Sequence, residues 1–429
     1  MVPRTSENLP SCCSTRALDD PVTVAVTGIG VACGLGHGKT AFRKGLYEAP
    51  DIFSCLTREG RGPAEGEPPF IGVEMPEPSE VLAPRLARTA SFSGRVALSV
   101  LQEAWQDGGL DDIDPERIGL VVGGSNLMSR EQALAARDYS ARLAYVPPRH
   151  AHMFLDTDIC GLCASTFKIR GFAYSLGAAS ASGAVALIQA REAIRSGRVD
   201  VCIALGALQD LSAYDLHAMR SLGAMGSMRF SEQPGQACRP MDAARDGFIY
   251  GEACAALVLC RQDLAAAGKT YGRIAGVGLA VDGARGPEPN SAGQVRAAMT
   301  ALVEAGLSAS DIDYVNGHAT GTPAGDDAEC ETYRTLGLEE ARINATKSIL
   351  GHGLSAAGAI ETAAVFIQMK EGLLHPTRNL EKPLDSRFNW VRSEPAVHDI
   401  RRALKLSFGF GGMDAALVLE APDSGGHTS

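Results

Sequence analysis

The sequence lacks long hydrophobic runs and any excess of basic charge. None of its apolar runs approaches the roughly eighteen residues of a membrane-spanning helix, so no span is predicted. The formal net charge is −10, whereas a nucleic-acid surface needs a basic patch, so no nucleic-acid partner is expected. Residues 1–20 also lack the apolar core of a signal peptide and are predicted to be a polar leader.

The sequence also lacks a disulfide pattern. Its 11 cysteines are odd in number and scattered, and several, such as Cys202 and Cys254, lie inside apolar segments. In a chain of this length such cysteines indicate buried free thiols in a reducing compartment, so the cytoplasm is expected. Cys160 and Cys163 have CxxC spacing, but no second pair or suitably spaced histidine accompanies them, so no metal site is predicted.

Two further motif-like segments are incomplete. Gly38-Lys39-Thr40 resembles the end of a phosphate-binding loop, but Cys33 stands where the opening glycine belongs. The paired histidines of Arg149-His150-Ala151-His152 lie in a proline-rich stretch, which favours a solvated loop over a ligand site. Neither segment predicts bound phosphate or metal.

What the sequence does contain is the pattern of an α/β protein. Apolar runs of strand length alternate with helical stretches, and 429 residues suggest two fused halves or one large α/β unit. A helix, an acidic loop and a strand occur in this order over 96–122 and again over 295–315, which indicates an internal duplication or a coincidence common in α/β proteins. The first strand, predicted from Val22, is expected to reach a turn at Gly28 and Gly30.

The predicted division of the chain follows from these patterns. After the leader, an N-terminal half covers 21–265 and a C-terminal half covers 266–422, and residues 423–429 form a polar tail. The junction falls between two apolar strands, in the stretch 262–271.

Ser180 is the first candidate site residue. It follows the strand-length run Phe172–Leu176 and precedes an alanine-rich helical stretch that stops at Gly197. A hydroxyl at a strand-to-helix junction lies near the positive end of the helix. The segment is close to a nucleophile elbow but lacks its first glycine, so a plain N-cap serine remains an alternative interpretation.

Two histidines and a glycine-rich turn are the other candidates. His318 lies in GHATGT, ahead of Asp326 and Glu329, and His352 lies in NATKSILGHG. Both follow apolar strands, at the carboxyl edge where α/β sheets place ligands. The turn Leu406–Gly412, LSFGFGG, has a backbone that can approach a substrate closely.

These segments, with VAVTGIGVACGLG and CRPMDAARDGFIYGE, resemble in order the signatures of the elongating β-ketoacyl-acyl-carrier-protein synthases of the thiolase superfamily. The similarity runs from about Val22 to Leu419. It implies an α/β, thiolase-like five-layer αβαβα fold of two duplicated halves. It also implies a homodimer without metal or other cofactor, acting on acyl chains carried by the 4'-phosphopantetheine of an acyl carrier protein.

The resemblance also assigns roles to individual residues. Ser180 stands where the family has its nucleophilic cysteine, and smaller departures occur at Leu406, Met413 and Asp414. By resemblance, the catalytic residues are Ser180, His318, His352 and Lys347, with Glu361 supporting them, Thr320 and Thr322 binding phosphopantetheine, and the N–H groups of Ser180 and Phe408 forming an oxyanion hole.

A serine in place of the cysteine is similar to a branch of the family that decarboxylates malonyl-acyl-carrier protein to acetyl-acyl-carrier protein for β-branching in polyketide biosynthesis. The stretch Leu216–Met225 also resembles that branch. Decarboxylation is therefore the expected activity. Three alternatives remain: a condensing or chain-length-factor subunit of a heterodimer, an acyltransferase with Ser180 as nucleophile, and a non-catalytic scaffold. We further expect the strand Phe172–Leu176 at a homodimer interface.

Overall fold

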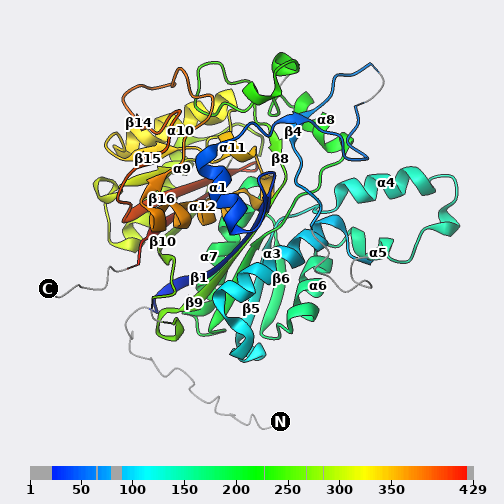
Figure 1. Cartoon of the computed structure of the whole chain (residues 1–429), viewed down its shortest axis with the longest axis horizontal. Helices are drawn as coiled ribbons and strands as arrows, with labels where there is room; N and C mark the ends of the chain where they lie inside the picture. Colours follow the sequence, from blue (N-terminus) through cyan, green and yellow to red (C-terminus); the bar gives the residue numbers. More distant parts are fainter. Residues whose placement is uncertain are drawn as a thin grey trace, which may run out of the picture.

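The computed structural model describes residues 22–63, 66–78, 89–226, 228–266, 268–283 and 285–422 (Figure 1). The predicted leader and the tail at 423–429 therefore lie outside the described residues. Among the described residues, no helix is both long enough and apolar enough to cross a membrane.

The chain forms two β-layers with one strand order, which join edge to edge into one continuous sheet. The first contains β1 (Val24–Cys33), β5 (Ile118–Gly123), β6 (Phe172–Leu176), β7 (Val201–Gly206) and β9 (Ala253–Arg261), in the order β1-β9-β7-β5-β6. The second contains β10 (Gly272–Val281), β11 (Tyr314–Asn316), β12 (Arg342–Asn344), β16 (Arg402–Gly409) and β17 (Met413–Glu420), in the order β10-β17-β16-β11-β12. Both orders place the first, fifth, fourth, second and third strands side by side. The predicted duplication is thus confirmed.

Helices lie on both faces of each sheet and between the two sheets (Figure 1). The central layer holds α7 (Ser182–Arg195) and α12 (Ala357–Glu371), whose apolar side chains share one core with both sheets. Outside the first sheet lie α3 (Phe92–Gly108) and α6 (Thr157–Phe167), and outside the second lie α9 (Ser291–Ala305) and α10 (Pro323–Leu336). The predicted five-layer αβαβα arrangement is therefore confirmed.

Glycines in β1 and β10 allow the outer helices to approach the sheets closely. A Cβ on Gly28 or Gly30 would lie less than 3.0 Å from backbone atoms of α3, and one on Gly276 or Gly278 would lie equally close to α9. Both strands also have a register shift next to the first glycine of the pair. The expectation of a turn at Gly28 and Gly30 is wrong: β1 continues to Cys33, and these glycines serve helix packing.

A second pair of glycines brings the two central helices together. A Cβ on Gly183, in the first turn of α7, would lie 2.6 Å from the backbone nitrogen of Ala359 in α12. Gly358 of α12 approaches the first turn of α7 as closely. The starts of the two helices therefore cross without side chains between them, which places the segments preceding each helix side by side.

The remaining elements connect these layers. They are β2 (Gly36–His37), α1 (Lys39–Glu48), β3 (Ser54–Cys55), β4 (Ile71–Val73), α4 (Ser129–Tyr139), α5 (His150–Met153), α8 (Ala213–Ser221), β8 (Tyr250–Gly251), α11 (Lys347–Leu350), β13 (Leu373–Leu374), β14 (Asn389–Trp390) and β15 (Ala396–Val397). One prediction is corrected here: the histidines expected in a loop at 149–152 belong to the short helix α5.

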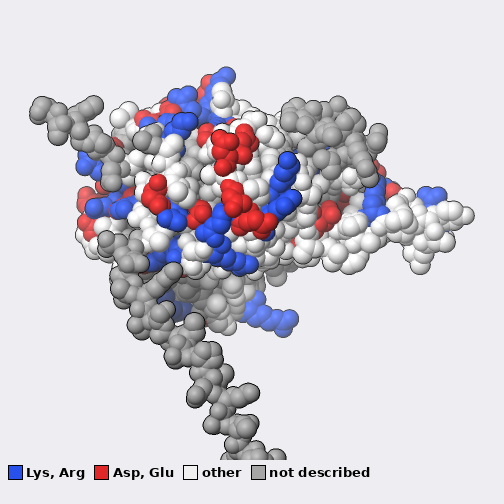
Figure 2. All heavy atoms as spheres, turned by 90° about the horizontal axis from the view of Figure 1, so that it is seen from below, with Lys and Arg blue, Asp and Glu red and all other residues white. Residues whose placement is uncertain are grey.

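The surface carries mixed charge. On the face shown in Figure 2, basic and acidic side chains lie next to one another. Many exposed arginines are paired, for example Arg261 with both Asp200 and Asp263. The cysteines of the described segments are free thiols, all buried except Cys55, and these segments contain no cluster of three or more side chains suited to a metal ion.

Candidate active site

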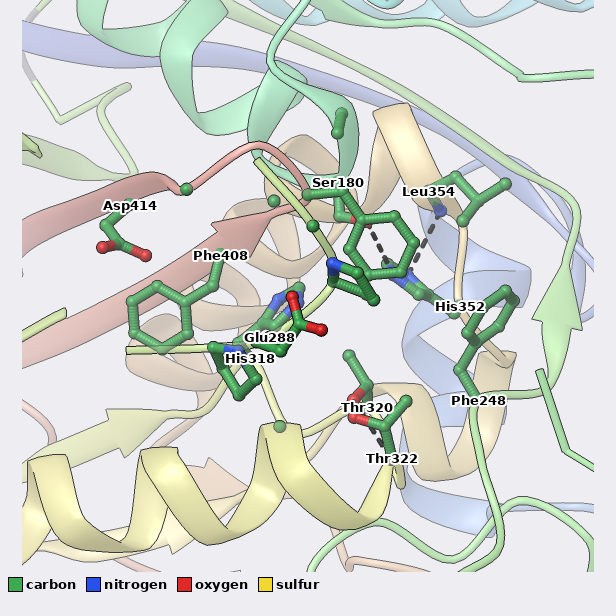
Figure 3. Close-up of a pocket in the computed structure, with 18 of the residues that line it drawn as sticks. Ser180, Phe248, Glu288, His318, Thr320, Thr322, His352, Leu354, Phe408 and Asp414 are labelled. Atoms are coloured by element: carbon green, nitrogen blue, oxygen red, sulfur yellow. Dashed lines mark hydrogen bonds between the residues drawn. The ribbon is translucent and has the colours of Figure 1, made fainter. Parts of the chain in front are cut away.

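A cavity of about 190 Å³ lies where strands of the two halves end (Figure 3). Ser180 reaches it from the carboxyl end of β6, and His318 from the end of β11. His352 follows β12, and Phe408 lies near the end of β16. The four residues singled out by the sequence thus line one cavity, at the sheet edge where α/β proteins bind ligands.

Ser180 is presented by a tight turn. The residue lies in a single 3₁₀ turn, Ala179–Ala181, between β6 and α7. The Oγ of Ser182 holds this turn, since it accepts the N–H of Ala178 at 2.8 Å and donates to the carbonyl of Ala179 at 2.7 Å. Ala179 has φ of 45°, a left-handed conformation that costs a non-glycine residue about 1–2 kcal/mol. The turn therefore fixes where the Ser180 side chain points.

The alternative of a plain N-cap serine does not hold. Ala181 is the N-cap residue of α7, and no side chain caps this helix. The Oγ of Ser180 instead lies 2.9 Å from the Nε2 of His352, across the boundary between the two halves.

His352 is a neutral hydrogen-bond donor. Its Nδ1 accepts the backbone N–H of Leu354 at 3.2 Å, so the ring proton is on Nε2. Burial, together with the ammonium groups of Lys347 and Lys405, holds the pKa of His352 well below its usual range. The ring is therefore uncharged near neutral pH, and its Nε2–H donates to the Oγ of Ser180.

His318 has the same tautomer for a different reason. Its Nδ1 lies 3.3 Å from the Nζ of Lys347, and because an ammonium group can only donate, Nδ1 is the acceptor. Burial, with positive charge from Lys347, lowers the pKa of His318 well below its usual range. The two imidazole rings stand nearly perpendicular, with centroids 5.5 Å apart. The cavity therefore holds two neutral imidazoles, each protonated on Nε2.

Beneath the histidines lies a buried group of two lysines and one glutamate. The carboxylate of Glu361 is 2.6 Å from the Nζ of Lys347 and 2.8 Å from the Nζ of Lys405. Lys347 also donates to the carbonyl oxygen of His318 at 2.5 Å. Lys405 donates to the backbone oxygen of Leu406 and lies almost fully buried. The predicted pair Lys347–Glu361 is present, but sequence reasoning missed Lys405.

Two carboxylates of α10 hold the loop that carries His318. Glu329 accepts the backbone N–H of His318 at 2.7 Å and of Ala319 at 2.6 Å. Asp326 accepts the N–H of Thr320 at 3.0 Å, and burial raises its pKa to about 7. These carboxylates satisfy backbone donors that would otherwise be buried without partners, so they fix the loop rather than face the cavity.

Thr320 and Thr322 also line the cavity. Their hydroxyls are hydrogen-bonded to each other at 2.9 Å, and Thr322 is the N-cap residue of α10. Phe408 packs edge-on against the ring of His318, with centroids 5.5 Å apart.

Three acidic side chains also line the cavity, which sequence reasoning did not predict. Asp282 and Glu288, from the loop after β10, line the cavity together with Asp414 of β17. Asp414 is almost fully buried, and burial and the neighbouring Asp282 raise its pKa to about 7. In Figure 3 Asp414 lies on the side of Phe408 away from His352.

Comparison with known proteins agrees with this geometry. The model of the β-ketoacyl synthase N-terminal domain matches residues 22–265, and that of the C-terminal domain matches residues 271–381. The polyketide biosynthesis malonyl-ACP decarboxylase PksF of Bacillus subtilis (strain 168) is 45% identical over 401 residues, which cover 92% of this chain and 96% of that protein. The 3-oxoacyl-[acyl-carrier-protein] synthase 1 of Haemophilus influenzae is 28% identical over 414 residues, covering 92% and 98%.

Solved structures have the same fold. A β-ketoacyl synthase from Burkholderia phymatum STM815 superposes with a TM-score of 0.83 at 25% identity, over 94% of this chain and all of that one. The ketosynthase of AntDE:AntF, solved with a type II polyketide acyl-carrier protein, gives a TM-score of 0.82 at 24% identity, covering 94% and 100%. The family predicted from the sequence is thus confirmed. This chain belongs to the β-ketoacyl synthase family.

Proposed function

We propose that this protein decarboxylates malonyl-acyl-carrier protein to acetyl-acyl-carrier protein in polyketide biosynthesis, in a β-branching pathway. The observation that carries the proposal is the pair of neutral imidazoles, His318 and His352, which share one cavity with Ser180. By the sequence resemblance, Ser180 stands where the family has its nucleophilic cysteine. The 45% identity to a malonyl-ACP decarboxylase supports it independently.

In the proposed reaction the two Nε2–H groups donate to the carbonyl oxygen of the malonyl thioester. As the bond from Cα to the carboxylate breaks, CO₂ leaves and its bonding electrons form an enolate, whose negative oxygen stays between the two donors. Donors that are already oriented stabilise such charge without reorganisation. Lys347 fixes the ring of His318, and the backbone N–H of Leu354 fixes that of His352, so both are ready before the substrate arrives.

The direction of the hydrogen bond at Ser180 argues against the acyltransferase alternative. A serine nucleophile needs a base that takes its proton. The Nε2 of His352 already carries a hydrogen, and its Nδ1 accepts the N–H of Leu354. His352 therefore donates to Ser180 and cannot remove its proton in this arrangement.

The malonyl group is proposed to arrive on the phosphopantetheine of a carrier protein, which acts as substrate and not as a resident cofactor. The hydroxyls of Thr320 and Thr322, on the cavity wall beside His318, are suited to the amides of that arm. The backbone N–H groups of Ser180 and Phe408 form the proposed oxyanion hole. A related ketosynthase fold has been solved with an acyl-carrier protein, which supports such a partner.

A homodimer is proposed through β6. Within the described chain this strand pairs with β5 alone and leaves its other edge without a strand. An uncovered edge is a ready template for pairing with another chain, and a second copy can cover it through a two-fold axis. The buried free thiols support the expected reducing compartment, the cytoplasm.

The decisive experiment incubates the purified protein with malonyl-loaded acyl carrier protein and follows the carrier by intact-mass spectrometry. We expect loss of CO₂ to give the acetyl form, with no β-ketoacyl product when acyl donors are added. A ketoacyl product without acetyl-carrier protein would instead identify a condensing subunit. An acyl adduct on Ser180 that turns over at the steady-state rate would identify an acyltransferase, and no reaction would identify a scaffold or chain-length factor.

A further inference from the structure

Decarboxylation and condensation differ in what happens to the enolate. In condensation the carbon nucleophile forms a new carbon–carbon bond, whereas release of an acetyl group requires a proton at Cα. The proposed function therefore needs a proton donor that a condensing site does not need. The donor must lie next to the groups that hold the enolate oxygen, because Cα and that oxygen are bonded to the same carbon.

The hydrogen bonds around Ser180 leave its proton available. The Nε2–H of His352 donates to the Oγ, at 2.9 Å, so this contact uses a lone pair of the hydroxyl and not its hydrogen. The hydroxyl hydrogen has no partner in the described structure and can point into the cavity. Ser180 also shares a hydrogen-bond donor with the proposed enolate oxygen, which places its hydroxyl beside Cα.

We infer that Ser180 is the proton donor that converts the enolate to the acetyl group, an assignment that rests on the proposed function. The serine is then a working replacement for the cysteine and not merely the loss of a nucleophile. Where the family's thiolate holds an acyl carbon for the enolate Cα to attack, the hydroxyl offers a hydrogen to that Cα.

The step balances without a further cofactor. The electron pair of the enolate forms a C–H bond at Cα, the O–H bond of Ser180 breaks, and the thioester carbonyl is restored. Negative charge then leaves the enolate oxygen and appears on the Oγ of Ser180. The Nε2–H of His352 can stabilise this charge by donating its hydrogen bond to the Oγ. A hydroxyl is a stronger acid than the methyl group of a thioester, so the transfer is favourable. Water then returns a proton to the serine, which accounts for the one proton consumed per CO₂ released.

Asp414 is the main competitor for this role. Its raised pKa, about 7, leaves part of the population protonated at neutral pH. However, Figure 3 places it across Phe408 from the pair Ser180–His352, away from the donors proposed to hold the enolate oxygen. The variant Asp414→Asn therefore serves as the matched control, because it removes this carboxyl and leaves Ser180 in place.

The experiment measures which group supplies the hydrogen. Malonyl-acyl-carrier protein is converted in an equal mixture of H₂O and D₂O by the wild type and by Ser180→Cys, Ser180→Thr, Ser180→Ala and Asp414→Asn. Intact-mass spectrometry gives the deuterium content of the acetyl product, and the deuterium already exchanged into unreacted malonyl chains is measured in the same spectrum and subtracted. In a mixture of H₂O and D₂O a thiol contains less deuterium than a hydroxyl. If residue 180 donates the hydrogen, a change from hydroxyl to thiol therefore changes the deuterium content of the acetyl product.

We expect Ser180→Cys to lower the deuterium content relative to the wild type, and Ser180→Thr and Asp414→Asn to leave it unchanged. Ser180→Ala should change the content, because water then protonates the enolate. Its rate should fall by less than the roughly 100-fold typical of a lost acid in a rate-limiting step, since CO₂ release precedes this transfer. Equal deuterium content in all Ser180 variants would overturn the assignment, and a change confined to Asp414→Asn would transfer it to Asp414. Failure of the wild type to form any acetyl product would instead reject the proposed function.

Discussion

The two halves have one scaffold but different chemistry. In the N-terminal half, β7 is apolar throughout, and the turn after β6 presents one hydroxyl to the cavity, that of Ser180. In the C-terminal half, the equivalent of β7 is β16, which carries the buried Lys405, and β12 leads to a lysine and a histidine. Each half provides one of the two central helices, α7 and α12, whose starts cross next to the cavity. The proposed chemistry needs charge in only one half, and the other half contributes one side chain at the crossing.

The outer strands of the two halves also differ, in whether another strand covers them. In the C-terminal half the outer strand β12 is covered by β14. The equivalent strand β6 has no such cover in the described part of the chain. The proposed dimer would therefore use one end of the molecule only, the end whose strand leads directly to Ser180.

The largest effect is expected from breaking the donor pair of the C-terminal half. His318→Ala or His352→Ala should each lower the rate of decarboxylation by about 10²–10³-fold, because each removes one donor to the enolate oxygen. The measurement is the single-turnover rate of acetyl-carrier protein formation.

The matched variant is His352→Gln, whose amide retains an N–H donor. It should recover part of the rate that His352→Ala loses. Both variants should be folded and give the same circular dichroism spectrum as the wild type. A rate for His352→Ala within threefold of the wild type, in a folded protein, would contradict the role of the imidazoles as the main catalytic donors.

The second effect concerns the uncovered edge. Ala173 is an exposed residue of β6, and Ala173→Arg should place charge in the proposed interface and convert the dimer to a monomer. Size-exclusion chromatography with light scattering measures the mass. Val397 is 88% exposed on β15, which pairs with β13 and does not belong to the large sheet, so Val397→Arg is the control and should remain dimeric. A monomeric wild type at micromolar concentration would count against the dimer.

Much of this fold could be predicted because its signals are local. Strand-length apolar runs and repeated helix–loop–strand patterns indicated an α/β protein with an internal duplication, and the family resemblance implied the five layers. Glycine-flanked histidines marked the strand ends that meet at the cavity. The prediction for Gly28 and Gly30 was wrong because two kinds of glycine look the same in a sequence. One kind ends a strand, and the other allows a helix to pack closely against it. Only the position of α3 distinguishes them.

The missed site residues have non-local partners. Lys405 lies in a strand where alternating polar and apolar residues usually mean a solvent-facing lysine, but its counter-ion Glu361 comes from a different element. Asp282 and Glu288 lie in a loop with no periodic pattern. In the sequence, Asp414 was noticeable only because it departs from the family pattern. Its membership of an acidic group that lines the cavity becomes visible only when the structure places it next to Asp282.

The third effect is on stability and depends on pH. Asp414 has its pKa raised to about 7 in the folded protein, so the folded state holds this proton more tightly than the unfolded chain does. Ionising the buried carboxyl therefore costs stability increasingly as the pH rises from about 4 to 7. Asp414→Asn removes that cost, and its gain in unfolding free energy should be about 1–3 kcal/mol larger at pH 8 than at pH 5. Denaturant unfolding at the two pH values measures this, and a gain independent of pH would contradict the assigned ionisation.

The smallest effect is expected from the second lysine. Glu361 is shared by Lys347 and Lys405, so the buried group carries an excess positive charge. Lys405→Met removes one desolvated cation while Glu361 keeps Lys347, so no charge is left without a partner and stability should change little. Lys405 does not line the cavity, and the rate at pH 8 should therefore fall by no more than about tenfold, which is about 1.4 kcal/mol.

What Lys405→Met should change is the titration of the histidines. The ammonium group of Lys405 contributes to the low pKa of both His318 and His352. Without it, both pKa values should rise toward the ordinary value, and the imidazoles should protonate at a higher pH than in the wild type. Nitrogen-15 NMR of the histidine rings follows this directly and also reports the Nε2–H tautomer. His375 is the internal control: it is also buried, with a pKa lowered to about 4, but Lys405 is not among the groups that shift it. Equal movement of all three rings would mean that the substitution loosens the core, whereas movement of His318 and His352 alone would locate the effect in the charge beneath the active site.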